Sequence, residues 1–218
     1  MPKRIFLVHP TPLAMPPVDE AFKTLWREAQ VLNLLDESLY ADVGANGELT
    51  PALYTRLTNL FRHCEASGAD GIVFSGSTFG PAVEEARKAV KVPVLRIEEA
   101  MMDVAAARSG SILLACTQKR AQPVVRGTLD AAAARTGTTL NVTELWVAGA
   151  RDALNKGDND THDRLIAEQC AAAGSFDQIV FGMMSMAPAK AKMTPALAQK
   201  VLTSGEAAVA RMRKLLGE

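Results

Sequence analysis

The pentapeptide Asp-x-Ile-Val-Phe occurs twice in this chain of 218 residues, at residues 70–74 and again at residues 177–181. Each copy is a short apolar run that begins after a Gly/Ser turn and ends in small residues, which is typical of a buried parallel strand. The copies are followed by Ser75-Gly76-Ser77-Thr78 and by Gly182-Met183-Met184-Ser185. A protein built from two similar α/β halves usually binds its ligand at the carboxyl ends of such strands. The two tetrapeptides are therefore the first candidates for a functional site.

Apolar runs and helix-period segments alternate along the chain. We predict strands at residues 5–8, 31–35, 72–74, 94–97, 112–115, 140–145 and 179–181. We predict helices at residues 18–29, 51–67, 81–90, 98–107, 122–135, 160–173 and 195–216. Two helix starts are marked by an N-cap hydroxyl followed by proline, at Thr50-Pro51 and Thr194-Pro195.

This alternation predicts an α/β protein whose mostly parallel sheets are flanked by helices. The repeat divides it into two pseudo-symmetric lobes with the site in the cleft between them. We expect the first lobe to comprise residues 1–100 together with about residues 205–218, because the last helix is expected to pack back on it. Residues 101–204 then form the second lobe.

Composition excludes several classes of function. Lys+Arg and Asp+Glu are both 24, so nothing in the net charge favours nucleic acid or an anionic membrane surface. The three cysteines show no C-x-x-C spacing, which argues against a disulfide scaffold or a metal site. No apolar segment approaches transmembrane length, and the first apolar run is too short for a signal sequence. We expect a soluble cytoplasmic protein that needs no metal.

Gly76, Ser77 and Thr78 lie between a predicted strand and a predicted helix, and they are candidates for a carboxylate cradle. Glycine lets a backbone approach a ligand closely, hydroxyls donate hydrogen bonds, and a helix N-terminus favours an anion. An ordinary capped strand–helix turn explains the same residues, and both interpretations stay open. The loop lacks the lysine and the spacing of a phosphate-binding P-loop.

The end of the first strand of the second half supplies Cys116 and Thr117. A helix N-terminus lowers the pKa of a thiol, which makes Cys116 a candidate reactive group. The alternative interpretation of Cys116 is a small buried hydrophobic residue.

Candidates also follow three other strands. His9 is a candidate proton-transfer group because its reference pKa is near neutral, although it also fits a polar surface residue. Glu98 is a candidate acid that also fits a helix cap or a solvated charge. Met183, Met184 and Ser185 follow the second repeat strand, where the methionines form either an adaptable substrate wall or a plug between the lobes.

These residues resemble the aspartate/glutamate/hydantoin racemase superfamily over nearly the whole chain. The resemblance is carried by the segments Asn33 to Leu39, Gly71 to Gly80, Val92 to Met101, Leu114 to Thr117 and Asp177 to Ala187. It implies two pseudo-symmetric α/β lobes, no cofactor, and chemistry at the carbon next to a carboxylate. Members often pair, so a homodimer is expected by analogy.

The family racemases use two cysteines, one per lobe, to remove a proton and to return one on the opposite face. Matched strand to strand, those cysteines fall on Gly76 and Met183, neither of which exchanges a proton. Gly76-Ser77-Thr78 resembles the first site of the arylmalonate decarboxylase branch, but Met183 replaces the thiol which that branch retains.

Both thiols are lost, while the hydroxyls expected to bind the substrate oxyanion are retained at Ser77, Thr78, Thr117 and Ser185. This pattern leaves several functions open. The leading hypothesis is a racemase- or isomerase-like enzyme with a substitute acid/base pair, for which Cys116, His9 and Glu98 are the candidates. A cofactor-free decarboxylase of the arylmalonate type is the second hypothesis. A small-carboxylate-binding protein without turnover, or a relative whose site has drifted, is the third.

Overall fold

The computed structural model describes residues 1–43, 48–108 and 110–218, and it divides the chain into two compact units. Unit 1 comprises Met1–Glu98 and Ala208–Glu218, and unit 2 comprises Glu99–Ala207. In the described residues, no helix combines the length and the apolar character needed to cross a membrane.

Unit 1 is built on a four-stranded parallel sheet with the strand order β2-β1-β3-β4. The strands are β1 (Arg4–His9), β2 (Gln30–Leu35), β3 (Gly71–Phe74) and β4 (Val94–Arg96). The helices are α1 (Met15–Leu25), α2 (Ser38–Ala41), α3 (Pro51–Ala66) and α4 (Gly80–Ala86), with the short 3₁₀ helices η1 (Pro12–Ala14), η2 (Ser77–Phe79) and η3 (Arg87–Ala89).

The main core of unit 1 joins one face of this sheet to α3 and α4. Phe74 from β3 packs edge-to-face against Phe61 of α3 and Phe79 of η2, with ring centroids 6.2 and 5.7 Å away. All three rings are fully buried, as are Leu53 and Leu57 on the same face of α3. The aromatic contacts fix the direction in which the chain leaves β3, and that exit carries the candidate site.

Unit 2 repeats the same topology with the strand order β6-β5-β7-β8. The strands are β5 (Ser111–Cys116), β6 (Asn141–Trp146), β7 (Gln178–Phe181) and β8 (Val201–Leu202). The helices are α5 (Glu99–Ala107), α6 (Gln122–Thr136), α7 (Ala150–Asn155), α8 (Asn159–Ala172), α9 (Pro195–Ala198) and α10 (Ser204–Leu215), with the 3₁₀ helices η4 (Lys119–Ala121) and η5 (Met184–Lys192).

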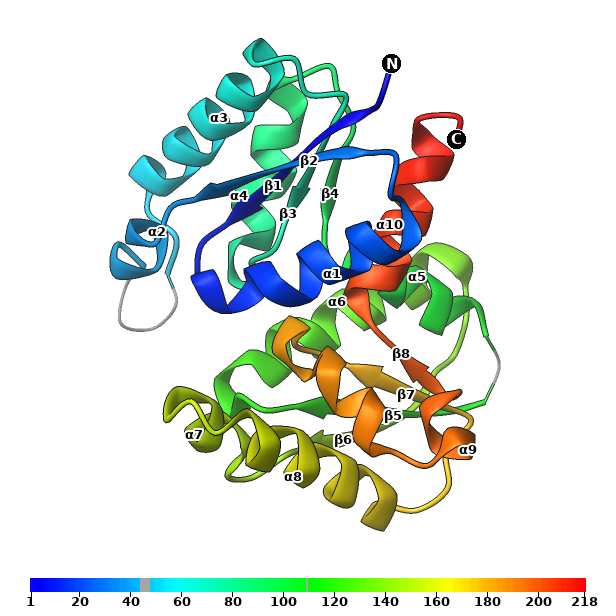
Figure 1. Ribbon diagram of the computed structural model, residues 1–218. Coiled ribbons are helices and arrows are strands. Elements are labelled where there is room, and N and C mark those ends of the chain that lie inside the picture. Colours follow the sequence, from blue (N-terminus) through cyan, green and yellow to red (C-terminus); the bar gives the residue numbers. More distant parts are fainter. Residues whose placement is uncertain (44–47, 109) are drawn as a thin grey trace. The chain divides into compact units, whose positions relative to one another are not determined.

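Helices cover both faces of the second sheet (Figure 1). On one face, Leu114 and Val180 of the sheet pack with α5 and α6. On the other face, Leu113 and Phe181 pack with α7, α8 and η5. Burial on both faces explains why the repeat strands are continuously apolar instead of alternating.

The aspartate of the repeated pentapeptide has the same role in both units. Asp70 Oδ2 accepts a hydrogen bond from the backbone N–H of Arg4 at 2.7 Å, and Asp177 Oδ2 accepts one from Ser111 at the same distance. In both units the aspartate therefore ties the start of the repeat strand to the start of the strand beside it. The two-halves prediction, with parallel sheets flanked by helices, is confirmed by this shared construction.

The seven predicted strands and the caps at Thr50 and Thr194 are confirmed. The prediction of one helix over residues 195–216 is wrong, because this segment forms α9, β8 and α10. Val201 and Leu202 pair with Ile179 and Val180 of β7, so pairing to the sheet overrides the helical spacing of the apolar residues. Strand β8 is the fourth strand that makes the two strand orders match.

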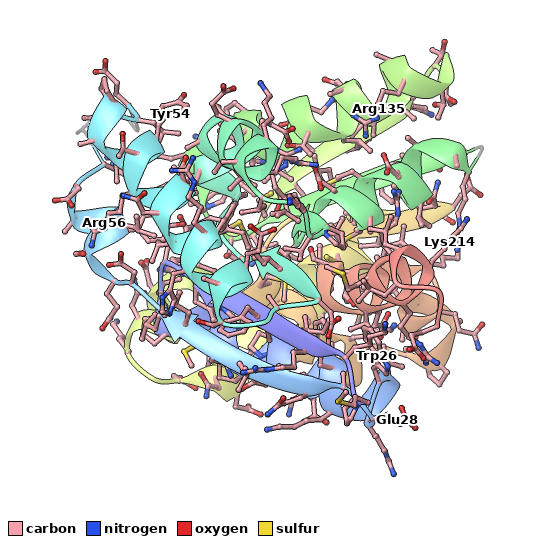
Figure 2. The ribbon with its side chains drawn as sticks, turned by 90° about the horizontal axis from the view of Figure 1, so that it is seen from above. Trp26, Glu28, Tyr54, Arg56, Arg135 and Lys214 are labelled. Atoms are coloured by element: carbon pink, nitrogen blue, oxygen red, sulfur yellow. The ribbon has the colours of Figure 1, made fainter. Side chains whose placement is uncertain are left out.

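Helix α10 begins in unit 2, and its last turns belong to unit 1. The Arg213 guanidinium lies over the ring of Trp26, 5.7 Å from its centroid, and donates a hydrogen bond to the carbonyl of Leu25 at 3.0 Å. Figure 2 shows Trp26 next to this helix. The end of α10 is thereby attached to the segment that follows α1.

Candidate functional site

The carboxyl ends of β1 and β3 bring His9 and Ser75 together. His9 is the last residue of β1, and Ser75 follows the last residue of β3, its neighbour in the sheet. The Ser75 Oγ lies 2.8 Å from His9 Nδ1. His9 has no exposed surface, whereas Ser75 keeps 8% of its surface exposed. Of the two residues, only the serine has any exposed surface.

The other ring nitrogen of His9 is held by a second pair of side chains. His9 Nε2 lies 2.8 Å from Asn33 Oδ1 on β2, and Asn33 Nδ2 donates to Asp19 Oδ1 on α1 at 2.9 Å. An ionised aspartate only accepts hydrogen bonds, so the Asn33 atom facing Asp19 is the NH₂ group. The Asn33 atom facing His9 is then the carbonyl oxygen, and His9 Nε2 carries the proton.

This arrangement fixes the direction of every hydrogen bond in the chain Asp19–Asn33–His9–Ser75. Burial lowers the pKa of His9 below its ordinary value, against the opposing effects of the Asn33 hydrogen bond and the Asp19 charge. The ring is therefore neutral near pH 7, and its Nδ1 has a free lone pair. The Ser75 hydroxyl donates to that lone pair, and its oxygen gains electron density as a result.

Gly76 is packed more tightly than the sequence suggests. A Cβ atom added to this residue would lie 2.6 Å from Cγ of Pro10, 2.9 Å from the Phe74 ring and 3.1 Å from the Phe79 ring. The glycine thus admits a close approach by Pro10 and by two core rings. A side chain of any size at position 76 requires these neighbours to move.

Ser77 and Thr78 follow in η2 and are both partly exposed. Neither hydroxyl makes a hydrogen bond to any other residue that the structure describes. Two partly exposed hydroxyls thus follow Ser75 in the chain, and they are free to donate to a ligand. The carboxylate cradle at these positions stays a prediction.

In unit 2 the equivalent strand ends are apolar. Cys116 ends β5 as His9 ends β1, and Gly182 follows β7 as Ser75 follows β3. A Cβ atom on Gly182 would lie only 2.5 Å from Cys116 Sγ, so the thiol occupies the space where a side chain at 182 would stand. Cys116 is fully buried, and burial raises its pKa to about 12, with the Glu144 charge adding to the rise. This surrounding disfavours Cys116 as a thiolate.

The other predicted residues of unit 2 lie in the same region. Thr117 follows Cys116 and is 2% exposed, and its Oγ1 has no hydrogen-bond partner among the described residues. Met183, Met184 and Ser185 are partly buried at the start of η5. Binding roles for these four residues stay predictions.

Glu98 is 3% exposed and lies just after β4. The Oε1 atom of Glu98 lies 3.8 Å from Nη1 of Arg96. The Nε atom of the same arginine lies 3.3 Å from Oε1 of Glu84. The arginine therefore lies between two carboxylates. These contacts favour a structural role for Glu98 over proton transfer.

A model of the Asp/Glu/hydantoin racemase family matches residues 18–212. The chain belongs to this family. An allantoin racemase from Klebsiella pneumoniae has a similar fold, with a TM-score of 0.71 and 19% identity over 99% of this chain and 88% of that one. An aspartate racemase homologue from Pyrococcus horikoshii gives a TM-score of 0.69 and 16% identity, covering 99% of this chain and 100% of that one.

An unliganded arylmalonate decarboxylase is also similar in fold, with a TM-score of 0.63 and 17% identity over 99% of this chain and 93% of the other. A search of curated protein sequences gives no match.

The sequence suggested His9 and the loop that contains Ser75, but it did not join the two, and it gave no role to Asn33 or Asp19. Asn33 lies 24 residues from His9, and Ser75 lies 66 residues from it, so only parallel pairing of β1 with β2 and β3 joins them. A signal was present, because His9 and Ser75 both follow predicted strands and such ends meet at one edge of a sheet. Asp19 gave no signal, since it lies within a helix-period segment. Within the described ranges, no group of three or more metal-ligating side chains is found.

Proposed function

We propose that this family member catalyses racemase- or isomerase-like chemistry at the carbon next to a carboxylate, with Ser75 and His9 as the proton-transferring pair. The observation that carries the proposal is the fixed tautomer of His9, whose unprotonated Nδ1 accepts the Ser75 proton. Membership of the racemase family supplies the reaction class.

In this mechanism the hydroxyls of Ser77 and Thr78 hold the substrate carboxylate. Ser75 Oγ removes the α-proton while its own proton passes to His9 Nδ1. Reversal of these steps returns a proton to the same face of the carbon and gives hydrogen exchange. For racemisation, water donates a proton on the opposite face, and the Ser75–His9 pair then returns the proton it holds to solvent. The negative charge that develops on the carboxylate as an enediolate is stabilised by the two hydroxyl donors. The positive charge on His9 is stabilised through Asn33 by the carboxylate of Asp19.

A cofactor-free decarboxylase is the second candidate. One specific observation favours it: the polar pair stands in unit 1, while Cys116 and Gly182 occupy the equivalent positions of unit 2. Decarboxylation of a malonate requires delivery of only one proton, whereas racemisation requires protons to leave and arrive on opposite faces. The same enediolate and the same donors serve both reactions.

The test uses the whole protein in D₂O with a panel of amino acids, hydantoins, malonates and maleate. Exchange of the α-hydrogen, followed by NMR, supports the racemase or isomerase proposal, and release of CO₂ supports the decarboxylase. Thermal stabilisation by a carboxylate without exchange or CO₂ release supports a non-catalytic binding protein. Absence of all three would contradict the carboxylate proposal.

The proposal also covers the location, the ligand and the oligomeric state of the protein. We place it in the cytoplasm with a small carboxylate as its ligand, and by analogy with the family we propose a homodimer. Size-exclusion chromatography with light scattering tests the dimer independently of catalysis.

A further inference from the structure

We infer that Ser75 is also a His9-activated nucleophile, which gives this protein a serine acyl-transfer activity toward small esters. The inference goes beyond the proposed carbon-acid chemistry, because the serine oxygen attacks a carbonyl carbon instead of removing a proton from carbon. It rests on the order Ser75–His9–Asn33–Asp19 and on the direction of the hydrogen bonds along it.

A serine hydroxyl becomes a nucleophile when an adjacent base accepts its proton and a third group orients that base. His9 Nδ1 meets the first condition, at 2.8 Å from Ser75 Oγ. Asn33 meets the second, because its carbonyl holds the Nε2 proton in place at 2.8 Å. Asp19 in turn fixes the amide of Asn33. No residue in this chain of contacts has to change its rotamer for the proton to move.

The difference in burial between His9 and Ser75 makes Ser75 Oγ the reactive atom of the two side chains. His9 has no exposed surface and both of its nitrogens are hydrogen-bonded in the unacylated protein, so the serine oxygen, and not a ring nitrogen, is the atom that attacks. Ser75 retains 8% exposure, and its oxygen keeps lone pairs that do not point at His9. Two and three residues further on, the hydroxyls of Ser77 and Thr78 are available to hydrogen-bond the oxyanion.

The reaction balances without any further reagent than water. The Ser75 Oγ forms a bond to the ester carbonyl carbon while its proton moves to His9 Nδ1. The bond to the alcohol then breaks, and the departing alcohol takes that proton. Water attacks the acyl-serine and gives its proton to His9, which returns a proton to Ser75 Oγ as the carboxylic acid leaves.

The test is covalent labelling of the whole protein with a fluorophosphonate, followed by mass spectrometry of the peptide that contains Ser75. In this reaction the serine oxygen bonds to phosphorus, fluoride leaves, and the serine proton passes to His9. We expect one label per chain at Ser75, none in Ser75→Ala, and about 10²-fold or greater slowing in His9→Asn, the range for loss of a general base.

Ser175→Ala is the matched control, because Ser175 is exposed and lies on the loop before β7. Labelling of this variant should equal that of the unaltered protein. The labelling rate should stay level from pH 8 down to the ordinary histidine pKa of about 6.5 and fall only at more acidic pH. A buried pair that merely joins strands gives no label and no such pH profile.

A second variant tests the inference if Ser75→Ala fails to fold. Ser75→Cys places a thiol beside His9, whereas burial raises the pKa of the native thiols to about 11 for Cys64 and about 12 for Cys116 and Cys170. Iodoacetamide at pH 6 should alkylate position 75 first. Equal alkylation of all four thiols, or labelling of Ser75 that His9→Asn does not slow, would overturn the inference.

The result is separable from that of the proposed function. Labelling requires no carboxylate substrate, and release of p-nitrophenol from p-nitrophenyl acetate by the same protein measures turnover. Hydrogen exchange without labelling would overturn the nucleophile and leave the proposed function standing. Labelling without exchange or CO₂ release would support the nucleophile and contradict the proposed carbon-acid chemistry.

Discussion

The two units of this chain have the same strand order but opposite chemistry at equivalent strand ends. In unit 1, His9 and Ser75 form a hydrogen bond, and Asn33 on the neighbouring strand β2 hydrogen-bonds the other ring nitrogen of His9. In unit 2, the same places hold a buried thiol and a glycine with no room for a side chain, Cys116 and Gly182. The strand register that brings residues together is therefore shared, and the residue types decide which unit carries a reactive pair.

The fourth residue of β2 and the fourth residue of β6 extend the comparison. Asn33 pairs in register with Leu7 of β1, and Glu144 pairs with Leu114 of β5 at the equivalent place. The neutral amide of Asn33 orients a histidine, while the charge of Glu144 contributes to raising the pKa of Cys116. Asn33 therefore helps to activate His9 in unit 1, whereas its counterpart Glu144 disfavours ionisation of the Cys116 thiol in unit 2.

The largest effect is expected from Ser75→Ala. Loss of the hydroxyl removes the group through which His9 reaches a ligand, so α-hydrogen exchange should slow by about 10² to 10⁴-fold. The measurement is deuterium incorporation by NMR, with substrate affinity measured separately. The matched change in unit 2, Cys116→Ala, should leave exchange within a few fold. A larger loss in the Cys116 variant than in the Ser75 variant would reverse the assignment of chemistry to unit 1.

Ser77→Ala should have the next largest effect, this time on binding. A hydrogen bond to a charged group is worth about 1.5–3 kcal/mol, so the Kd of any carboxylate ligand should rise by about 10 to 100-fold. Calorimetric titration measures it, and Thr78→Ala should act similarly. Unchanged affinity in both variants would show that the carboxylate does not bind at η2.

Gly182→Ala tests the apolar half of the comparison. The new Cβ meets Cys116 Sγ, so we expect a loss of about 1–3 kcal/mol in the free energy of unfolding, the usual cost of overpacking. Chemical denaturation measures it. Combining the change with Cys116→Ala should recover part of the loss, because the two sites are in contact. Additive losses in the double variant would show that the thiol is not what excludes a side chain at 182.

The smallest effect concerns the pH dependence of stability. Burial lowers the pKa of His9 in the folded state, so below pH 6.5 the unfolded chain binds more protons than the folded one. The contribution of His9 to the free energy of unfolding is therefore fully present above the ordinary histidine pKa. It is lost as the pH falls toward the lowered pKa of His9 in the folded state. His9→Asn should flatten this dependence, which denaturation at a series of pH values measures. Equal slopes in the unaltered protein and in His9→Asn would contradict a buried neutral His9.

The sequence predicted the fold better than the site. Apolar runs placed the strands, and Thr50 and Thr194 marked helix starts, because such local signals depend on neighbouring residues. Strand β8 was missed because its two residues are defined by pairing with β7. Ser75 was noticed only as part of a loop, since its role depends on the His9 tautomer, which the contact between Asn33 and Asp19 determines. Gly76 was interpreted as an approach for a ligand, while the structure fills that space with Pro10.

The central claim is that His9 is a neutral base whose Nδ1 accepts a proton from Ser75. Nitrogen NMR of the protein with ¹⁵N-labelled histidine measures this directly, and His9→Asn identifies which of the three ring systems belongs to His9. We predict a neutral ring at pH 7 that is protonated on Nε2, with an Nδ1 resonance that shifts in Ser75→Ala. A charged ring, a proton on Nδ1, or an Nδ1 resonance unaffected by Ser75→Ala would contradict the account.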